Sequence, residues 1–451
     1  MSETSKQELR EAISEIRRLL AQRTAEPVIA FVEPLHPSDL ADLVEHLDAE
    51  ERLTLLEIVP APLASEALAE MEEEEHPAEL LAQMEPARIA ELVEELADDD
   101  AADLIGDLEP DEQERILDSV PASEEIRELL EYPEESAGGI MTREMVVVRA
   151  QDTAHETIES LREHANDRED LYTVFVVDNR DRLKGVVTLR DLVLAAPTTL
   201  ILDMLEQPVA VVPVDMDQEE VGKILSRYNL ASIGVVDDSG KLVGSITFDD
   251  VIDVVEAETT EDILRFASVS DEEQLRGTTL GAIRSRLPWL IVNSLTLSVA
   301  ALVVWAYRDT IEQLVMLAAV MPVVAGLGGN AGTQALAVTI RRIALSDETQ
   351  TERWSAVGKE LVVGLVNGLV IGGLIAVAAS LIPGTDPAFG IVVMIAMWGN
   401  LIVASTLGAF FPIVLERIGT DPAVASSIFV TTFTDLFGFL LLLGLASAFL
   451  L

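Results

Sequence analysis

The chain has 451 residues, with 30 Lys and Arg against 79 Asp and Glu, and it contains no cysteine. Without thiols, disulfide bonds and thiolate metal sites are excluded. From residue 281 onward there are 8 basic and 10 acidic residues, which leaves 22 basic and 69 acidic residues in the front part. An acidic front repels phosphates, so cations are expected partners and nucleic acid is not. Adaptation of the surface to a high-salt cytoplasm would produce the same acidic excess.

Residues 1–132 are expected to form helices only, because apolar residues recur there at helical spacing. Prolines lie where helices would start, and the polar N-terminus shows no signal peptide. Many short helices without a strand favour a right-angled stack or a small superhelix. A solvated face accounts for most of the acids, but one cluster is denser than such a face requires. It comprises Asp98, Asp99, Asp100 and Asp103.

Residues 132–142 (YPEESAGGIMT) form a linker, and after it the period changes from helical to strand-like. Residues 133–255 are assigned to one domain, which contains an internal repeat. FVVDNRDRLKGVVTLRDLV from Phe175 recurs 59 residues later as GVVDDSGKLVGSITFDDVI from Gly234. The matched positions are Gly185 with Gly244, Thr188 with Thr247, and Asp191 with Asp250. Each copy is predicted to run strand, helix, hairpin and helix.

This repeat resembles a tandem pair of cystathionine-β-synthase (CBS) modules. In that family the Thr and Asp of a G-h-h-T-x-x-D motif (h apolar) often contact the phosphate and ribose of an adenine nucleotide. The resemblance places a candidate ATP site at Thr188, Arg190 and Asp191. A second copy lies at Thr247 and Asp250. The alternative is that each Asp only caps the helix that follows it.

Residues 249–280 are expected to form an acidic linker helix. Its acids lie at spacings of three to five and therefore near one side: Asp250, Asp253, Glu258, Glu261 and Asp262. Like charges this close repel one another unless a cation or a basic group lies between them. Only Arg265 and Arg276 are nearby, so the pattern predicts cation binding.

Residues 281–451 contain five apolar runs, each long enough to cross about 30 Å of hydrocarbon. They are placed at 287–307, 313–338, 359–382, 389–415 and 424–450. If the runs alternate in direction, seven flanking basic residues fall on one side and only Arg308 falls on the other. The positive-inside rule then predicts a cell-membrane protein with cytoplasmic N-terminal domains and an external C-terminus.

The last run carries one carboxylate, Asp435, and Thr431 and Thr434 lie close to it in the sequence. A charge at membrane depth is costly, so it is expected to face an ion path, unless protonation or a neighbouring helix neutralises it. Met321-Pro322 and then a glycine-rich stretch break the second run, and the glycines at 326, 328, 329 and 332 permit either close helix approach or an unwound turn. Asn330 supplies a neutral oxygen there.

The donors in these runs are carboxylate, amide and hydroxyl oxygens, which suit Mg²⁺ or Ca²⁺ rather than Zn²⁺ or Cu⁺. Mg²⁺ gives up its water reluctantly, so a wide site with one or two carboxylates fits it. A two-fold partner would supply the second carboxylate.

The order of domains, the P-x-x-x-x-x-G-G-N-x-G motif and the final DPA…TDxxG resemble the MgtE family of magnesium channels. The resemblance implies a homodimer in the lipid membrane, built from an all-α N-terminal domain, an α+β CBS pair, a plug helix and five transmembrane helices. It implies that cytosolic Mg²⁺ closes the pore, that Asp435 is the pore carboxylate, and that Asp421 lies at the cytoplasmic end of its span. The regulatory acids it implies are Asp217, Glu219, Asp250, Asp253, Glu258, Glu261, Asp262, Glu66, Asp99 and Asp103, with Gly138 or Gly139 in the linker. Asn229 stands where other members offer an Asp, which predicts a weaker interdomain site.

Two readings of another class remain open. One is a proton-coupled exchanger, of Mg²⁺ or of another divalent cation such as Co²⁺ or Mn²⁺. The other is a membrane sensor of nucleotide or cation that carries no flux. No G-x-x-x-x-G-K-[ST] motif is present, so neither a primary pump nor any other enzyme is expected.

Overall fold

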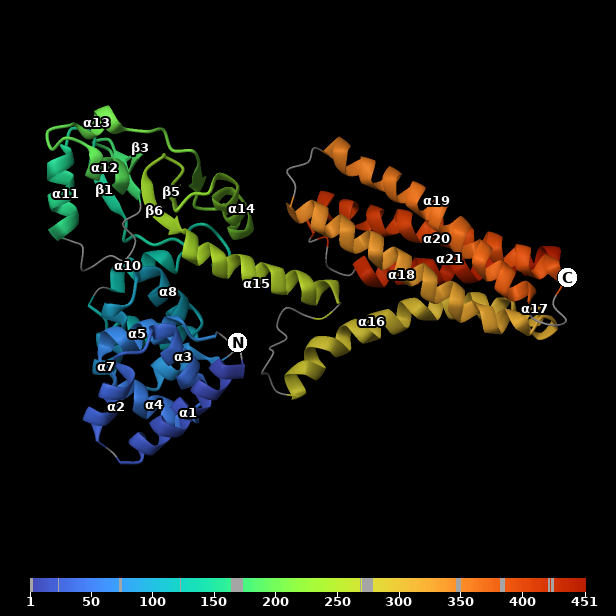
Figure 1. The fold of residues 1–451 in the computed structure, drawn as a ribbon, viewed down its shortest axis with the longest axis horizontal. Helices are drawn as coiled ribbons and strands as arrows, with labels where there is room; N and C mark the ends of the chain where they lie inside the picture. Colours follow the sequence, from blue (N-terminus) through green and yellow to red (C-terminus); the bar gives the residue numbers. More distant parts are fainter. Residues whose placement is uncertain are drawn as a thin grey trace. The chain divides into compact units, whose positions relative to one another are not determined.

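The computed structural model describes residues 3–22, 24–72, 75–121, 123–163, 173–267, 269, 279–345, 350–381, 386–420, 422 and 426–451. The chain forms two compact units, Met1–Glu258 and Thr259–Leu451. Figure 1 shows the first as short helices followed by small sheets, and the second as a bundle of long helices.

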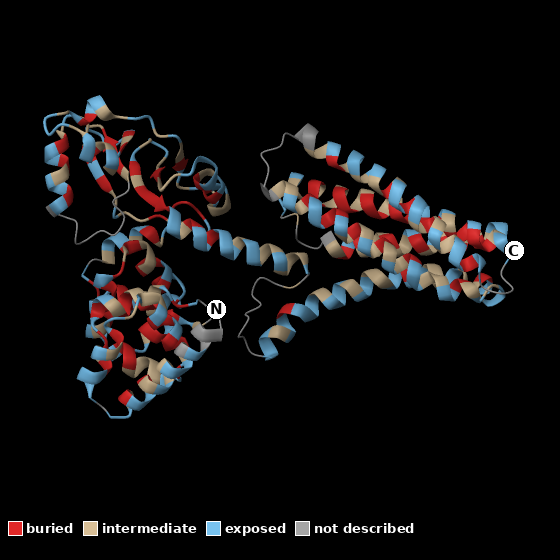
Figure 2. Cartoon of the chain, in the orientation of Figure 1, coloured by how far each residue is buried: buried red, intermediate tan, exposed pale blue. Residues whose placement is uncertain are grey.

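The N-terminal part of the first unit is helical throughout its described residues, as expected. Proline is the first residue of α3, α6, α7 and α9, where its missing N–H would have no partner in any case. The helices are α1 (Glu3–Leu20), α2 (Ala25–Val32), α3 (Pro37–Glu45), α4 (Ala49–Ile58), α5 (Ala61–Ala69), α6 (Pro77–Ala82), α7 (Pro86–Glu95), α8 (Asp98–Gly106), α9 (Pro110–Leu117) and α10 (Ser123–Leu129). Figure 2 shows their buried residues inside and their exposed residues outside.

The internal repeat appears as two sheets of the same topology. In each, the first strand pairs parallel with the second, and the second pairs antiparallel with the third. The strands are β1 (Val146–Arg149), β2 (Thr173–Val177), β3 (Leu183–Thr188), β4 (Val211–Pro213), β5 (Ser232–Val236) and β6 (Leu242–Thr247). The helices are α11 (Ala154–Glu163), α12 (Leu189–Leu194), α13 (Ile201–Met204), α14 (Gln218–Tyr228) and α15 (Phe248–Phe266). The register shifts at Val176/Val177 and at Val235/Val236, so even this irregularity is repeated.

The two motif glycines let a second segment approach the sheet. A Cβ on Gly185 would overlap Leu205 and the backbone oxygen of Glu206, and one on Gly244 would lie 2.9 Å from the oxygen of Thr142. The next residue in each copy forms a bridge with the approaching segment: Val186 with Glu206, and Ser245 with Thr142. The segment before each module's first strand is thus held on the third strand of the other module.

The second unit has helices long and apolar enough for five membrane spans, which confirms the expected number within the described residues. The helices are α16 (Thr279–Ala306), α17 (Arg308–Gln313), α18 (Met316–Leu345), α19 (Gln350–Ser380), α20 (Pro387–Arg417) and α21 (Ser426–Phe449). Short α17 lies between the first two spans. In the apolar stretch of α20, 56% of the residues are buried, against only 6% in that of α16, so α20 is central in this unit.

Of the two alternatives for the break in the second span, the unwound turn is wrong and close helix approach is confirmed. Helix α18 continues through Pro322 and the glycine-rich stretch. Backbone polar groups in hydrocarbon cannot bond to water, so an unwound segment is unfavourable there. Pro and Gly are tolerated inside a span because neighbouring helices help to satisfy the backbone groups that they free. The glycines act by close approach instead: Cβ atoms on Gly328 and Gly332 would overlap side chains of α20 and α21 respectively.

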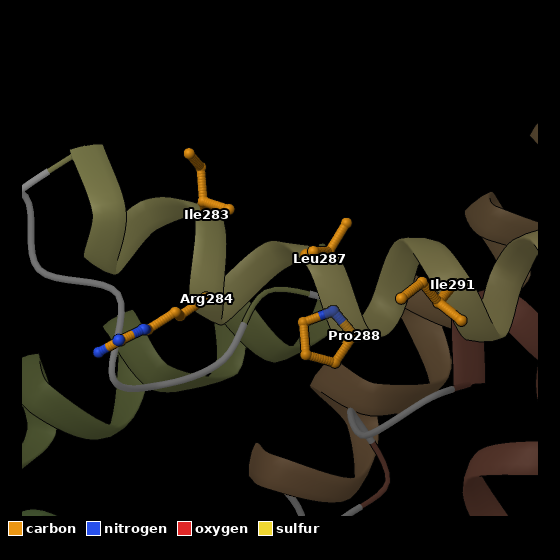
Figure 3. A pocket seen from close by; sticks show the side chains of 5 residues that line it. All are labelled: Ile283, Arg284, Leu287, Pro288 and Ile291. Carbon is orange, nitrogen blue, oxygen red and sulfur yellow. The ribbon is translucent and has the colours of Figure 1, made fainter.

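A shallow hollow follows the exposed flank of α16 (Figure 3). It is lined by Ile283, Arg284, Leu287, Pro288 and Ile291. None of these side chains offers an oxygen ligand, so the hollow is not a candidate cation site.

Candidate functional site

The linker before β1 is pinned to the second CBS module. Its Ala137 N–H donates to Met216 O at 2.7 Å, and Gly138 N–H donates to Val214 O at 2.9 Å. A Cβ on Gly138 would lie 2.6 Å from the Tyr132 ring, and one on Gly139 would overlap the backbone oxygen of Glu134. Neighbouring groups lie so close to positions 138 and 139 that a side chain would not fit, which explains both glycines of the expected linker site.

Three of the expected regulatory acids, Asp99 and Asp103 of α8 and Asp250 of α15, influence one another. Burial, then the charges of Asp250 and Asp100, raise the pKa of Asp99 well above its usual range. Asp99 Oδ1 is buried and has no hydrogen-bond partner in the described part of the chain. A buried oxygen without a donor, beside like charges, is a ligand that a cation would satisfy.

Asp103 belongs to the same group. Partial burial, then Asp100 and Glu134, raise the pKa of its carboxyl to about 7. The residue as a whole is exposed, so solvent partly screens these charges. Burial also raises the pKa of Asp250, although hydrogen bonds from Thr247 act in the opposite direction.

Asp253 lies one turn further along α15. Its residue is exposed, and burial of part of the carboxyl, followed by Asp250 and Glu70, raises its pKa. Glu70 ends α5, the helix that carries the half-buried Glu66. The structure thus places charges of α5 and α15 within mutual influence.

A second acidic group gathers where α14 begins. Asp217 caps that helix by accepting from Glu219 N–H at 2.9 Å, and Gln218 Nε2 donates to Glu258 Oε1 at 2.8 Å. Burial, then Glu219, Asp217 and Glu135, raise the pKa of Glu258. Asp217, Glu219 and Glu258, which are far apart in sequence, are therefore neighbours.

Three of the predicted regulatory acids remain: Glu261, Asp262 and Asp421. Glu261 forms an ion pair with Arg265, and Asp262 is half-buried on α15. Asp421 lies outside the described residues. No group of three or more His, Asp or Glu side chains in the described ranges is close enough to form a metal cage. The acids are repelling neighbours, and a hydrated cation would bridge them more readily than a dehydrated one.

Sequence reasoning missed three acids of these groups, Glu70, Glu134 and Glu135, whereas Asp100 belongs to the dense cluster that the sequence singles out. The signal was present in the linker, where two consecutive glutamates precede the glycines, but only the glycines were noticed. Asn229 has a backbone φ of 50° at the end of α14. Asn is the residue that adopts this left-handed conformation most easily after Gly, which gives the position a capping role.

The Thr and Asp of each CBS motif bond to each other at the start of the following helix, and in the first motif Thr188, rather than Asp191, is the cap of α12. Thr188 hydrogen-bonds with the Asp191 carboxylate and accepts from Asp191 N–H at 3.2 Å, and Thr247 Oγ1 donates to Asp250 Oδ2 at 2.5 Å. The two motifs differ in exposure. Thr247 is only 5% exposed, whereas Thr188 and Arg190 are exposed and accessible to a ligand.

In the second unit, α18, α20 and α21 meet at a polar centre. Asn400 is fully buried, its Nδ2 donates to Val324 O at 3.0 Å, and a Cβ on Gly438 would lie 2.8 Å from that nitrogen. Thr434 is fully buried and donates within α21 to Thr431 O at 2.9 Å.

The other predicted pore residues keep solvent-accessible surface in the second unit. Asp435 and Thr431 are half-exposed on α21, and Asn330 is exposed on α18. Gly326 and Gln334, four residues before and after Asn330, are exposed too, so one side of α18 carries a polar stripe. Of the four predicted pore residues, Thr434 is therefore the one that is buried between helices.

The sequence matches a family of divalent cation transporters, MgtE, over residues 321–445. It also matches the MgtE intracellular N domain over residues 35–135 and CBS domains over residues 137–197 and 201–257. These matches confirm the resemblance of the CBS repeat, and they agree with the expectation that the chain is not an enzyme.

Similar proteins cover most of the chain. The magnesium transporter MgtE of Thermus thermophilus is 36% identical over 92% of this chain and 93% of its own length. That of Enterococcus faecalis is 38% identical over 72% of each chain. A crystal structure of the cytosolic domain of the Mg²⁺ channel MgtE in complex with ATP superposes with a TM-score of 0.51, at 37% identity, over 54% of this chain and 99% of that one. Taken with the five apolar helices, these similarities show that the chain is a multi-pass membrane protein of the MgtE family.

Proposed function

We propose that the protein carries Mg²⁺ across the cell membrane along a path that includes Asp435, Thr431 and Asn330. The observation that carries this proposal is a partly exposed carboxylate in a membrane span of a chain similar to magnesium transporters. Carboxylate and neutral oxygens are the ligands Mg²⁺ prefers, and few of them are needed when the ion keeps its water. Thr434 would support the path from the helix interface.

We infer that two copies assemble around this path, with the N-terminal domains cytoplasmic and the C-terminus external. The polar stripe of Gly326, Asn330 and Gln334 supports the assembly, because amides facing lipid are costly. A second copy or the water of the path would cover them. The two-fold partner would also add a second Asp435.

The acidic groups of the first unit support closure of the path by Mg²⁺. At low Mg²⁺, the charges around Asp99 and Asp250 repel one another, and a bound cation removes the repulsion. A ligand that binds one arrangement better shifts the population toward it. Because α15 leads along the chain to the first span, ordering of α15 would act on the path.

A nucleotide would bind at Thr188, Arg190 and Asp191, the exposed copy of the motif. A similar cytosolic domain has been crystallised with ATP. We expect the nucleotide to tune the first unit and not to be hydrolysed.

The test is a flux assay in proteoliposomes that contain the full-length protein. Mg²⁺, Mn²⁺, Co²⁺ and Ca²⁺ are offered in turn, and the reversal potential is recorded with and without a pH gradient. Mg²⁺ flux that follows its own electrochemical gradient supports a channel. A reversal potential that moves with pH would favour a proton-coupled exchanger, and binding without flux would leave only a sensor.

A further inference from the structure

Asp98 differs from the other acids of its cluster. It is the first residue of α8 and only 7% exposed. Its Oδ1 accepts from Thr142 Oγ1 at 2.6 Å and from Asp99 N–H at 3.1 Å. The Arg143 N–H lies 3.1 Å from Oδ1 and 3.0 Å from Oδ2. Donors already occupy this carboxylate, whereas Asp99 Oδ1 has none among the described residues.

The residues that Asp98 holds are themselves fixed to the second CBS module. Thr142 exchanges two backbone hydrogen bonds of 2.9 Å with Ser245 of β6. This pairing requires the close approach at Gly244. Two residues beyond Ser245, Thr247 hydrogen-bonds with Asp250 at the start of α15. Hydrogen bonds at both ends of this stretch of β6 therefore connect α8, through the backbone of residues 245–247, to the acid that lies near Asp99 and Asp103.

The Arg143 side chain does not neutralise Asp98, since its Nη1 donates to Glu128 of α10 at 2.5 Å. Asp98 is held by a hydroxyl and backbone amides alone. Hydrogen bonds to an ionised group are strong, and losing one partner leaves a buried charge short of donors.

We propose that Asp98 is a positioning residue that clamps α8 onto Thr142 and Arg143, and thereby holds Asp99 and Asp103 beside Asp250. It binds no cation itself. The inference rests on the proposed function in one respect, that a cation binds between these acids.

The first experiment compares Thr142→Val with Thr142→Ser in the full-length protein. Valine keeps the shape and removes the donor to Asp98, whereas serine keeps the donor. The readout is the Mg²⁺ concentration that half-protects residues 1–258 from protease. We expect the valine variant to need about tenfold more Mg²⁺, the effect of losing one charge-assisted hydrogen bond, and the serine variant to behave as the wild type.

Substitutions of Asp98 separate a clamp from one more negative charge. Asp98→Asn keeps an acceptor for Thr142, whereas Asp98→Ala removes it, and both remove the charge. A clamp predicts a larger rise in the required Mg²⁺ for alanine than for asparagine. Equal effects of both substitutions, with a silent Thr142→Val, would show that Asp98 acts through its charge and would overturn the proposal.

Hydrogen exchange without Mg²⁺ tests the clamp independently of cation binding. In Thr142→Val and Asp98→Ala, the Arg143 amide should exchange at least severalfold faster, while the amides of β2 and β3 serve as folded-state controls. Unchanged exchange at Arg143 overturns the clamp. Faster exchange with an unchanged Mg²⁺ midpoint overturns the positioning role. A wild type that does not respond to Mg²⁺ would refute the proposed closure and leave the exchange result to decide on the clamp.

Discussion

Asn400 of α20 donates its side-chain Nδ2–H to the backbone oxygen of Val324 in α18, at 3.0 Å. The contact is possible because residue 328 of α18 is glycine: a Cβ there would overlap that nitrogen. Gly329, the next residue, faces open space in this unit. The pair therefore offers a matched test of whether the glycine-rich stretch serves packing.

Gly328→Ala should destabilise the helix bundle by about 1–3 kcal/mol, through overpacking against Asn400, and should lower Mg²⁺ flux. Gly329→Ala adds the same methyl group where nothing meets it and should be milder in both respects. Thermal unfolding in detergent and flux in proteoliposomes check this. If the two variants lost stability equally, backbone conformation rather than packing would explain the glycines.

Asp435→Ala should abolish Mg²⁺ uptake and leave a folded protein, because a half-exposed side chain contributes little packing. Asn330→Ala should impair flux or ion preference less, since it removes a neutral oxygen. Thr432→Val is a suitable control, because the Thr432 hydroxyl donates only within its own helix, to Ile428 O at 2.7 Å. Flux near the wild-type rate in Asp435→Ala would exclude this carboxylate from the path.

The architecture could be read from the sequence where the signal is periodic. The 59-residue offset that matches Gly185 with Gly244 also relates β2 to β5, β3 to β6 and the irregularities of these pairs. What the offset could not show is why glycine is needed, because the residues that approach Gly244, Met141 and Thr142, lie far from it in the sequence.

The sequence predicts many of the acids of the candidate site, but not which of them lie together in the fold. Helical spacing along α15 suggested one acidic face. The structure instead divides it: Asp250 influences Asp99, Glu258 lies near Asp217, and Glu261 pairs with Arg265. Two of those partners, Asp99 and Asp217, come from other elements and the third comes from within α15, and spacing within one helix carries no information about the first two.

Mg²⁺ binding by the first unit should depend on pH near neutrality. The pKa of Asp103 is raised to about 7, above its usual value, so the repulsion is full above pH 7 and shrinks as protons bind below it. Mg²⁺ must displace that proton, so the apparent affinity should fall by at most about tenfold per pH unit below 7.

Titrations with Mg²⁺ at pH 6, 7 and 8, followed by calorimetry in two buffers of different ionisation enthalpy, measure this proton release. Asp103→Asn should flatten the dependence in that window, while Asp118→Asn, a change in an exposed acid of the same domain, should leave it in place. A midpoint independent of pH in the wild type would place Asp103 outside the binding group.

ATP binding, if the first motif provides the site, should be lost in Thr188→Ala and weakened in Asp191→Asn. Thr247→Ala alters the matching position of the second copy, where the residue is buried, and should preserve ATP binding. Calorimetry with and without Mg²⁺ measures all three. Loss of binding only in Thr247→Ala would move the site to the second copy.

The acids of α15 differ in what lies beside them, so they should contribute unequally to closure by Mg²⁺. Asp250 lies at the start of α15, directly after the CBS pair, and is near Asp99 and Asp103 of the helical domain. A cation between them would therefore offset repulsion between two separate elements. Asp250→Asn should therefore shift the Mg²⁺ dependence of channel open probability strongly. The charge of Glu261 is compensated by Arg265, four residues on, so Glu261→Gln should shift this dependence little and is the matched control.

Deleting residues 1–132 removes Asp99 and Asp103, which a cation would bridge to Asp250, and should move the dependence of open probability to higher Mg²⁺. Several weak sites acting together would make the wild-type response steep, which a titration of single-channel activity resolves. If neither Asp250→Asn nor the deletion moves the curve, the acids serve only as a solvated surface, and Mg²⁺ does not close its own path.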